Sequence, residues 1–221
     1  MLLYYITDSR QLASDYKERA RLLLQCIQAA ARAGVDAIQL REKDLSARAL
    51  SDLAVRAANI IDAAIPTRKW KTQLLINSRV DIALACGADG VHLRSDDISP
   101  ADARAVLMNA GVATSTIAIS CHTLEEVELA EGHGADFAVF GPVFGKVGVN
   151  NSGVGTAALS QACRERAVAK PPMPVLALGG IDLSNARECL QVRAAGIAGI
   201  RLFQSGNVGE TVSRLRELGT G

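Results

Sequence analysis

Charge of one sign, long apolar runs and paired cysteines are all scarce in this 221-residue chain. Its 24 Lys and Arg residues offset 23 Asp and Glu residues, which leaves a formal net charge of +1. A chain so close to neutral gives no support to binding of nucleic acid or of an anionic membrane surface. No stretch of 18 uncharged apolar residues occurs, so we expect no membrane-spanning segment.

The cysteines are few and lack a pattern. All five are scattered, none forms a C-x-x-C pair, and their number is odd. This argues against a disulfide framework or a zinc site and fits a reducing compartment. The first eight residues lack a basic region followed by a long apolar one, so we expect no signal peptide and predict a cytoplasmic protein. With 49% hydrophobic residues, the chain can bury a large core.

One local pattern recurs at long intervals along the chain. A glycine follows a helical stretch and a short apolar strand comes next, at Gly34, Gly87, Gly134 and Gly196. Glycine readily adopts the left-handed conformation that ends a helix. The recurrence therefore predicts repeated αβ units.

Further apolar runs lie between these four copies and bring the expected strands to eight. The additional strands are expected at residues 2–7, 73–77, 116–121 and 174–178. Helical segments are expected at 17–33, 46–64, 79–85, 101–110, 123–132, 156–168 and 208–217. Continuous apolar strands are typical of a parallel sheet buried on both faces.

Eight such units favour a single TIM (β/α)8 barrel over residues 1–221. The alternative is a doubly wound sheet, which any αβ repeat can form. No nucleotide fingerprint supports that alternative, and no linker divides the chain. In a barrel, the functional side chains gather at the carboxyl ends of the strands.

The most informative strand end is Gln39-Leu-Arg-Glu-Lys43. Alternation places Gln39, Arg41 and Lys43 on one face of the strand and Leu40 on the other. Buried cations need an anionic partner, so this end is a candidate phosphate site. The alternative is a structural salt bridge to Glu42 or Asp44.

Other strand ends carry candidates for metal binding and anion contact. Asp96 and Asp97 could hold Mg²⁺, or they could cap the helix that begins near Pro100. Asn77 could donate to a phosphate, or it could cap the helix that follows it.

Histidine is the natural acid or base near neutral pH, and one histidine ends a strand. His122 lies beside Ser120 and is a candidate acid–base residue; the alternative is a histidine bonded to nearby backbone. His92 lies inside a strand and is expected to be a structural interior residue.

The last two strand ends favour a phosphate-binding backbone. Gly179 and Gly180 follow the seventh strand, and residues 203–205 follow the eighth, which is the usual phosphate position in this fold. Residues 141–155 form a long loop without apolar periodicity, which is typical of a lid, and Lys146 is its only charge.

These motifs, taken together, resemble one family. The chain is similar to thiamin phosphate synthase and to its relative, the thiazole tautomerase. The motifs follow the family's order along nearly the whole chain: Tyr5-Ile-Thr-Asp8, Gln39-Leu-Arg-Glu-Lys43, Leu75-Ile-Asn-Ser-Arg-Val-Asp81, Gly87-Ala-Asp-Gly-Val-His-Leu93, Ser120-Cys-His122, Gly141-Pro-Val-Phe144 and Gly179-Gly-Ile181.

The resemblance implies an enzyme that joins an aminopyrimidine methyl diphosphate to a thiazole phosphate and releases pyrophosphate. Electrostatic stabilisation of the leaving group would matter more than acid–base chemistry. The residues implied to contact pyrimidine and diphosphate are Gln39, Arg41, Lys43, Asn77 and Ser120. Asp97 is implied to bind Mg²⁺, and the Gly180 region with the backbone of Phe203 and Gln204 to hold the thiazole phosphate.

Three positions depart from the family pattern. The family's Asn-Asp pair is Asn77-Ser78 here, which removes one magnesium carboxylate that Asp96 could replace. The family's Thr-x-Thr-Lys stretch is residues 145–149, without a hydroxyl, and Lys146 could act as a displaced cation. The usual Gly-Gln pair is Arg94-Ser95, and Gln204 replaces a small residue.

Three functions are therefore open at this point. The favoured one is the Mg²⁺-dependent transferase, because the cations would have no use in a tautomerase. The second is the tautomerase itself, with His122 moving the proton. The third is a barrel that binds a phosphorylated small molecule without turnover. The sequence leaves homo-oligomerisation open.

Overall fold

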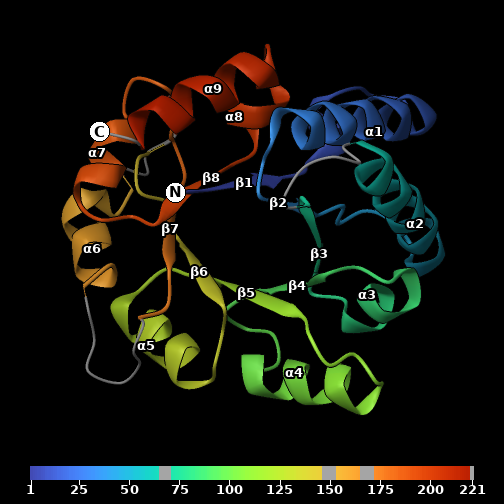
Figure 1. Cartoon of the computed structure of the whole chain (residues 1–221), viewed down its shortest axis with the longest axis horizontal. Helices are drawn as coiled ribbons and strands as arrows, with labels where there is room; N and C mark the ends of the chain where they lie inside the picture. The colour runs from blue at the N-terminus through green and yellow to red at the C-terminus, as the bar shows by residue number, and fades with distance from the viewer. Residues whose placement is uncertain (65–70, 146–152, 165–171, 220–221) are drawn as a thin grey trace.

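The computed structural model describes residues 1–64, 71–145, 153–164 and 172–219. Eight parallel strands form a closed barrel in which each strand pairs with its neighbours in sequence and β8 pairs with β1. Helices surround the strands (Figure 1). This confirms the (β/α)8 barrel, since a doubly wound sheet would have two open edges.

The elements lie close to the expected ranges. The strands are β1 (Leu2–Ile6), β2 (Ala37–Leu40), β3 (Gln73–Asn77), β4 (Gly90–Leu93), β5 (Thr116–Cys121), β6 (Phe137–Phe140), β7 (Val175–Leu178) and β8 (Gly196–Gly199). The helices are a short 3-10 turn η1 (Ser9–Gln11), α1 (Tyr16–Ala33), α2 (Ala47–Ala64), α3 (Val80–Cys86), α4 (Pro100–Asn109), α5 (Leu124–Gly132), α6 (Gly155–Ala162), α7 (Ala186–Gln191), α8 (Arg201–Gln204) and α9 (Val208–Leu218).

One expected helix is shorter than the sequence suggested. The helix expected at 156–168 ends at Ala162, and residues 165–168 lie outside the described part of the chain. None of the helices described is long and apolar enough to span a membrane.

Three of the four recurring glycines, Gly34, Gly87 and Gly134, have positive φ and lie where a helix ends, as expected. The expectation is wrong for Gly196, which is the first residue of β8; Arg193, with φ 70°, takes the left-handed position after α7. Gly34 is the left-handed C-cap of α1, with φ 93°. Its N–H donates to the carbonyls of Ala30 and Ala31. Gly87 has φ 64° and ends α3 in the same way. A side chain in this conformation is strained, so glycine lets each chain segment turn directly into the next strand.

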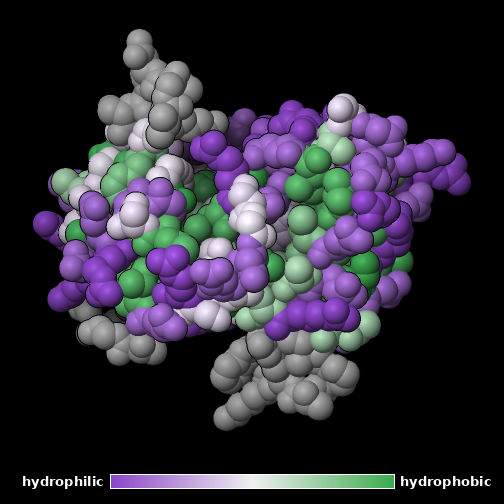
Figure 2. Space-filling view, turned by 90° about the horizontal axis from the view of Figure 1, so that it is seen from above, coloured by the Kyte–Doolittle hydropathy of each residue, from purple (hydrophilic) through white to green (hydrophobic). Residues whose placement is uncertain are grey.

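Alternation along each strand divides the core into two layers. On β1, Leu3 and Tyr5 face the surrounding helices, while Tyr4 and Ile6 fill the barrel interior with Leu75 and other residues. The outer surface in Figure 2 mixes hydrophilic and hydrophobic residues, because the continuous apolar surfaces are turned inward. The polar side chains that occur inside the barrel therefore need a specific explanation.

Candidate active site

Arg41 and Lys43 extend from the end of β2 without an anionic partner. Neither side chain forms an ion pair with any residue that the structure describes. Asp44 instead pairs with Arg19, with 3.2 Å between Oδ2 and Nη1. Both cations are therefore available to a ligand.

The neighbouring carboxylate is also occupied elsewhere. Glu42 is buried and accepts hydrogen bonds from the hydroxyls of Thr7 (2.7 Å) and Ser9 (2.5 Å). Burial raises the pKa of Glu42, which these hydroxyls partly oppose. The alternative of a structural salt bridge between Arg41 and Glu42 or Asp44 is thus wrong.

The cations at this end of the barrel repel one another. The charge of Arg41 is the main cause of a lowered pKa at Lys43, followed by partial burial and by Arg94 and Arg10. Burial also lowers the pKa of Arg41, against the nearby charge of Asp8. Such a group of like charges is stabilised when an anion binds among them.

A chain of hydrogen bonds joins three strand ends beside these cations. The Gln39 amide nitrogen donates to Asn77 Oδ1 (2.8 Å), and Asn77 Nδ2 donates to Ser78 Oγ (3.0 Å). Ser78 Oγ in turn donates to Asp97 Oδ2 (2.6 Å). Ser78 has φ 60°, a strained conformation for a residue other than glycine, and such strain is typical of functional sites.

Asn77 does not cap the helix that follows it. The residue before α3 is Arg79, whose side chain makes no capping bond, and Asn77 uses its amide within the chain of hydrogen bonds. The capping alternative for Asn77 is therefore wrong, and its side chain faces the candidate site.

Gln39 has a buried acceptor atom without a hydrogen-bond partner among the described residues. Its side chain is buried in the barrel interior, and its Oε1 has no hydrogen-bond partner among the described residues. A buried acceptor without a donor costs free energy, about 1–3 kcal/mol. A ligand with an N–H or O–H group would satisfy it.

The two aspartates at the end of β4 differ in position. Asp97 is the more buried and accepts from Ser78 Oγ and from the backbone N–H of Arg94 (2.8 Å). Asp96 is 71% exposed and pairs with Arg94. Neither caps α4, because Ser99 accepts from the backbone N–H of Asp102 there. The capping alternative is wrong for both.

The residues present fit a magnesium ion that is coordinated partly by the protein and partly by the phosphates of the bound substrate. Asp97 and the Ser78 hydroxyl place two oxygen donors side by side, 2.6 Å apart. The described residues contain no cluster of three or more His, Cys, Asp or Glu that could hold a metal alone. Mg²⁺ commonly takes one or two carboxylates and completes its shell with water and substrate phosphates.

His92 and Ser120 meet inside the barrel mouth. His92 is fully buried, and its Nε2 lies 2.8 Å from Ser120 Oγ, while Nδ1 lies 3.0 Å from the hydroxyl of Tyr4. Burial, with a contribution from the charge of Arg41, lowers the pKa of His92 to about 3. The expectation of an interior His92 is confirmed, and the imidazole is neutral.

His122 turns away from this group. Its side chain is 55% exposed, and Nδ1 lies 3.2 Å from Glu126 Oε2 in α5. The same carboxylate accepts the backbone N–H of His122 (2.6 Å). The structure therefore does not bring His122 together with Ser120, although the two are close in sequence.

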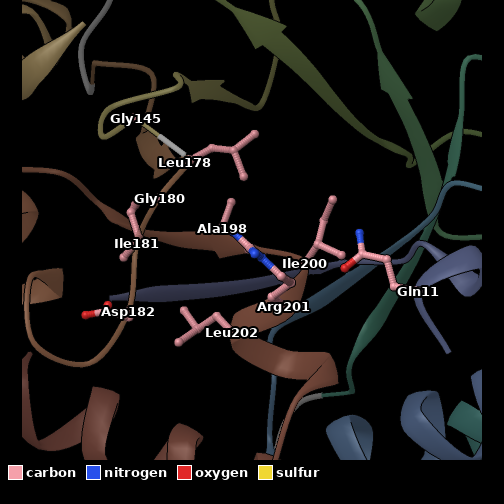
Figure 3. A pocket seen from close by; sticks show the side chains of 12 residues that line it. Gln11, Gly145, Leu178, Gly180, Ile181, Asp182, Ala198, Ile200, Arg201 and Leu202 are labelled. Atoms are coloured by element: carbon pink, nitrogen blue, oxygen red, sulfur yellow. The ribbon is translucent and has the colours of Figure 1, made fainter. Parts of the chain in front are cut away.

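A second region of the mouth is a cavity of about 570 Å³ after β7 and β8 (Figure 3). Gly179 and Gly180 line it with φ values of 99° and 64°. A Cβ on Gly180 would lie 2.6 Å from the carbonyl oxygen of Phe144. This close approach and the left-handed backbone both require glycine at position 180.

The residues expected to hold a phosphate after β8 need correction. The backbone N–H groups of Phe203 and Gln204 both donate to the carbonyl of Ile200, so neither is free. Phe203 is buried with its ring 6.0 Å from that of Tyr5, and the Gln204 side chain bonds to the backbone of Asp8. The segment around the end of β8 that lines the cavity is instead 198–202.

Arg201 is a candidate site residue that the sequence did not indicate. It lines the cavity and forms no ion pair with the described residues, and Figure 3 shows its guanidinium among the lining side chains. Its position two residues after the end of β8 is the signal that could have identified it. Lys146, the cation expected in the lid, lies outside the described residues, whereas Gly145 lines the cavity.

Comparison with known proteins assigns the chain to a family. A family model described as "Thiamine monophosphate synthase" matches residues 3–203. The chain belongs to this family. This confirms the resemblance that the seven motifs indicated.

Individual family members agree with this assignment. The chain is 40% identical over 198 residues to a putative thiamine-phosphate synthase of Geobacter sulfurreducens, covering 89% of this chain and 83% of the relative. It is 36% identical over 201 residues to a thiamine-phosphate synthase of Roseiflexus castenholzii, covering 89% and 78%. A thiamine phosphate pyrophosphorylase structure from Pyrococcus furiosus superposes with a TM-score of 0.77 at 29% identity, covering 99% of this chain and 95% of that one.

Proposed function

We propose that this member of the thiamine monophosphate synthase family joins an aminopyrimidine methyl diphosphate to a thiazole phosphate and releases pyrophosphate. One observation carries the proposal. Arg41 and Lys43, unpaired among the described residues, stand beside Gln39, whose buried acceptor also lacks a partner. This combination suits a ligand with an anionic group at one end and a hydrogen-bond donor at the other.

The two cations would bind the diphosphate and stabilise the pyrophosphate as it departs. Charge develops on the leaving oxygen while the bond to the pyrimidine methylene carbon breaks, and fixed positive groups lower that barrier. Gln39 Oε1 would accept a hydrogen bond from the pyrimidine amino group, which orients the ring.

Asp97 and Ser78 would hold Mg²⁺ against the diphosphate. The metal, when bound, supplies additional positive charge to the leaving pyrophosphate. Asp96 would stay outside this set, because its side chain is 71% exposed whereas that of Asp97 is 17% exposed, although both carboxylates lie within ion-pair distance of Arg94.

The thiazole phosphate would occupy the cavity after β7 and β8. Gly179, Gly180 and the backbone of 199–202 would accept the phosphate closely, and Arg201 would supply a positive charge. Once pyrophosphate has left, the thiazole nitrogen would form its bond to the pyrimidine methylene carbon.

The alternative isomerase receives no support from the geometry. A tautomerase needs an acid–base residue at the bound ring, and His122 is exposed and paired with Glu126. Among the described residues, the unpaired cations and Asp97 favour the transferase.

The test is direct turnover. Purified protein is incubated with both phosphorylated substrates and Mg²⁺, and formation of thiamin phosphate and pyrophosphate is measured in equal amounts. The expected result is Mg²⁺-dependent product that chelation of the metal abolishes. Absence of product at saturating substrates and Mg²⁺ would overturn the proposed function.

A further inference from the structure

Tyr4 and His92 form a polar contact across the interior of the barrel. Tyr4 comes from β1 and His92 from β4, and both side chains are buried. Their rings are stacked with centroids 5.6 Å apart, and the Tyr4 hydroxyl lies 3.0 Å from His92 Nδ1. Because the barrel interior is otherwise mostly apolar, this polar pair is costly unless its hydrogen bonds are satisfied.

The buried groups allow one arrangement of protons. Burial raises the pKa of Tyr4 well above its usual value, so its hydroxyl keeps its proton. His92 Nδ1 is the only hydrogen-bond partner of that hydroxyl among the described residues. If Nδ1 carried a proton, the buried Tyr4 proton would have no acceptor. Nδ1 therefore accepts, and the proton of neutral His92 lies on Nε2.

This assignment fixes the direction of the next bond. Nε2 donates to Ser120 Oγ across 2.8 Å, which occupies an acceptor position of the hydroxyl. The Ser120 proton then points away from His92, and Ser120 is only partly buried at the barrel mouth. A serine so arranged is a hydrogen-bond donor to an anionic oxygen.

We propose that Tyr4 and His92 are positioning residues that fix Ser120 as a donor to the diphosphate. The relay runs from the Tyr4 hydroxyl to His92 Nδ1 and from His92 Nε2 to Ser120 Oγ. The inference rests on the proposed function, because it takes the diphosphate as the ligand of Ser120. Tyr4 and His92 do not touch the substrate; they act through Ser120.

The charges around His92 are compatible with this arrangement. Burial is the main cause that lowers the pKa of His92; the charge of Arg41 acts in the same direction, and the charge of Asp97 opposes it more weakly. The imidazole thus stays neutral, with one donor and one acceptor, as the relay requires. A protonated ring would donate at both nitrogens and could not accept from Tyr4.

The first experiment reads the tautomer directly. The two-bond ¹⁵N–¹H couplings of the histidine side chains are recorded for the whole protein, with the exposed His122 and His133 as internal references. The expected result is His92 in the Nε2–H form, and a mixture of tautomers in Tyr4→Phe. The Nδ1–H form in the wild-type protein would overturn the proposal.

The second experiment is a double-mutant cycle with pyrophosphate and Mg²⁺ as the probe. Tyr4→Phe is expected to weaken pyrophosphate binding about three- to tenfold, the range for one lost hydrogen bond. The same substitution in a Ser120→Ala background is expected to have no effect, because the relay then has no end point. Equal losses in both backgrounds would mean a purely structural role and would overturn the proposal.

The same strand provides a matched control. Tyr5 is the next residue on β1 but faces the helices, and its buried hydroxyl has no partner among the described residues. Tyr5→Phe is expected to leave pyrophosphate affinity and the His92 couplings unchanged. These measurements need only pyrophosphate binding, so failure of the relay is distinguishable from absence of thiamin phosphate formation. If the wild-type protein did not bind pyrophosphate, the proposal that Ser120 donates to a diphosphate would be overturned.

Discussion

The two sides of the barrel mouth recognise an anion by different means. At the ends of β2 to β5, charged and polar side chains form the surface, and hydrogen bonds link Gln39, Asn77, Ser78 and Asp97. After β7 and β8, glycines and apolar side chains form most of the lining, Asp182 adds one carboxylate, and Arg201 is the single cation that lines the cavity among the described residues.

The difference separates two roles. A wall of side chains holds charge at fixed points and suits a group whose charge changes during the reaction. A glycine-rich lining lets a phosphate approach the backbone N–H groups closely and constrains the rest of the ligand less. Substitutions on the two sides should therefore change the kinetics of different substrates.

The largest effect is expected for Arg41→Ala. Removal of this unpaired cation should lower kcat/KM for the diphosphate substrate about 100- to 1,000-fold, as for loss of a main oxyanion donor. The KM for thiazole phosphate should stay the same, as measured by steady-state kinetics. The control is Arg48→Ala on the exposed face of α2. Equal kcat/KM in wild type and Arg41→Ala would contradict the claim that charged side chains on this side of the mouth bind the diphosphate.

Gly180→Ala tests the role of the glycines that line the cavity after β7. The new Cβ would meet the Phe144 carbonyl, so the loop must shift, and we expect the KM for thiazole phosphate to rise about 30-fold. The control Gly87→Ala has the same φ of 64° but nothing within 4 Å. Both variants should lose about 1 kcal/mol in the free energy of unfolding, from backbone strain. A rise in KM for both variants would show that strain, not crowding, is responsible.

Arg201→Ala should raise the KM for thiazole phosphate about tenfold, because one charged hydrogen bond to phosphate is lost. The KM for the diphosphate substrate should not change. Arg214→Ala, at an exposed position of α9, provides the matched control. If the diphosphate KM rose instead, the two sides of the mouth would not have separate roles.

The smallest effect is expected for Ser78→Asp. A second carboxylate beside Asp97 should lower the Mg²⁺ concentration for half-maximal pyrophosphate binding about fivefold. Without the metal, the two carboxylates should repel each other and lower the midpoint of thermal unfolding. Calorimetric titration with Mg²⁺ measures the first effect. An unchanged Mg²⁺ requirement would place the metal away from Ser78.

Much of the site could be predicted from the sequence because it lies at strand ends. Alternation placed Gln39 inside the barrel, and the motif order indicated the family. Local contacts were predicted less well. The sequence is compatible with helix capping by Asn77, Asp96 and Asp97, yet Ser99 caps α4 and Arg79 precedes α3 without a capping bond. A side chain near a helix start can turn toward a distant partner, and the local sequence does not show which.

The residues after β8 illustrate the same limit. Phe203 and Gln204 were expected to present free backbone N–H groups, but the short helix α8 uses both. The sequence predicts no helix between the eighth strand and residue 208, whereas α8 spans Arg201–Gln204 and draws these N–H groups into its own hydrogen bonds. A single helical turn is too short to show a periodic pattern in the sequence.

The local sequence is enough to predict the eight αβ units, their order and the cations at the end of β2, because hydrophobic periodicity and the glycines between helix and strand are local properties. Which polar groups meet depends on the three-dimensional arrangement of the strands. Closing the barrel brings Tyr4 of β1 against His92 of β4, 88 positions away, and leaves Arg41 without a partner among the described residues. Pairings of this kind follow from the register of the whole sheet, and no local segment contains that information.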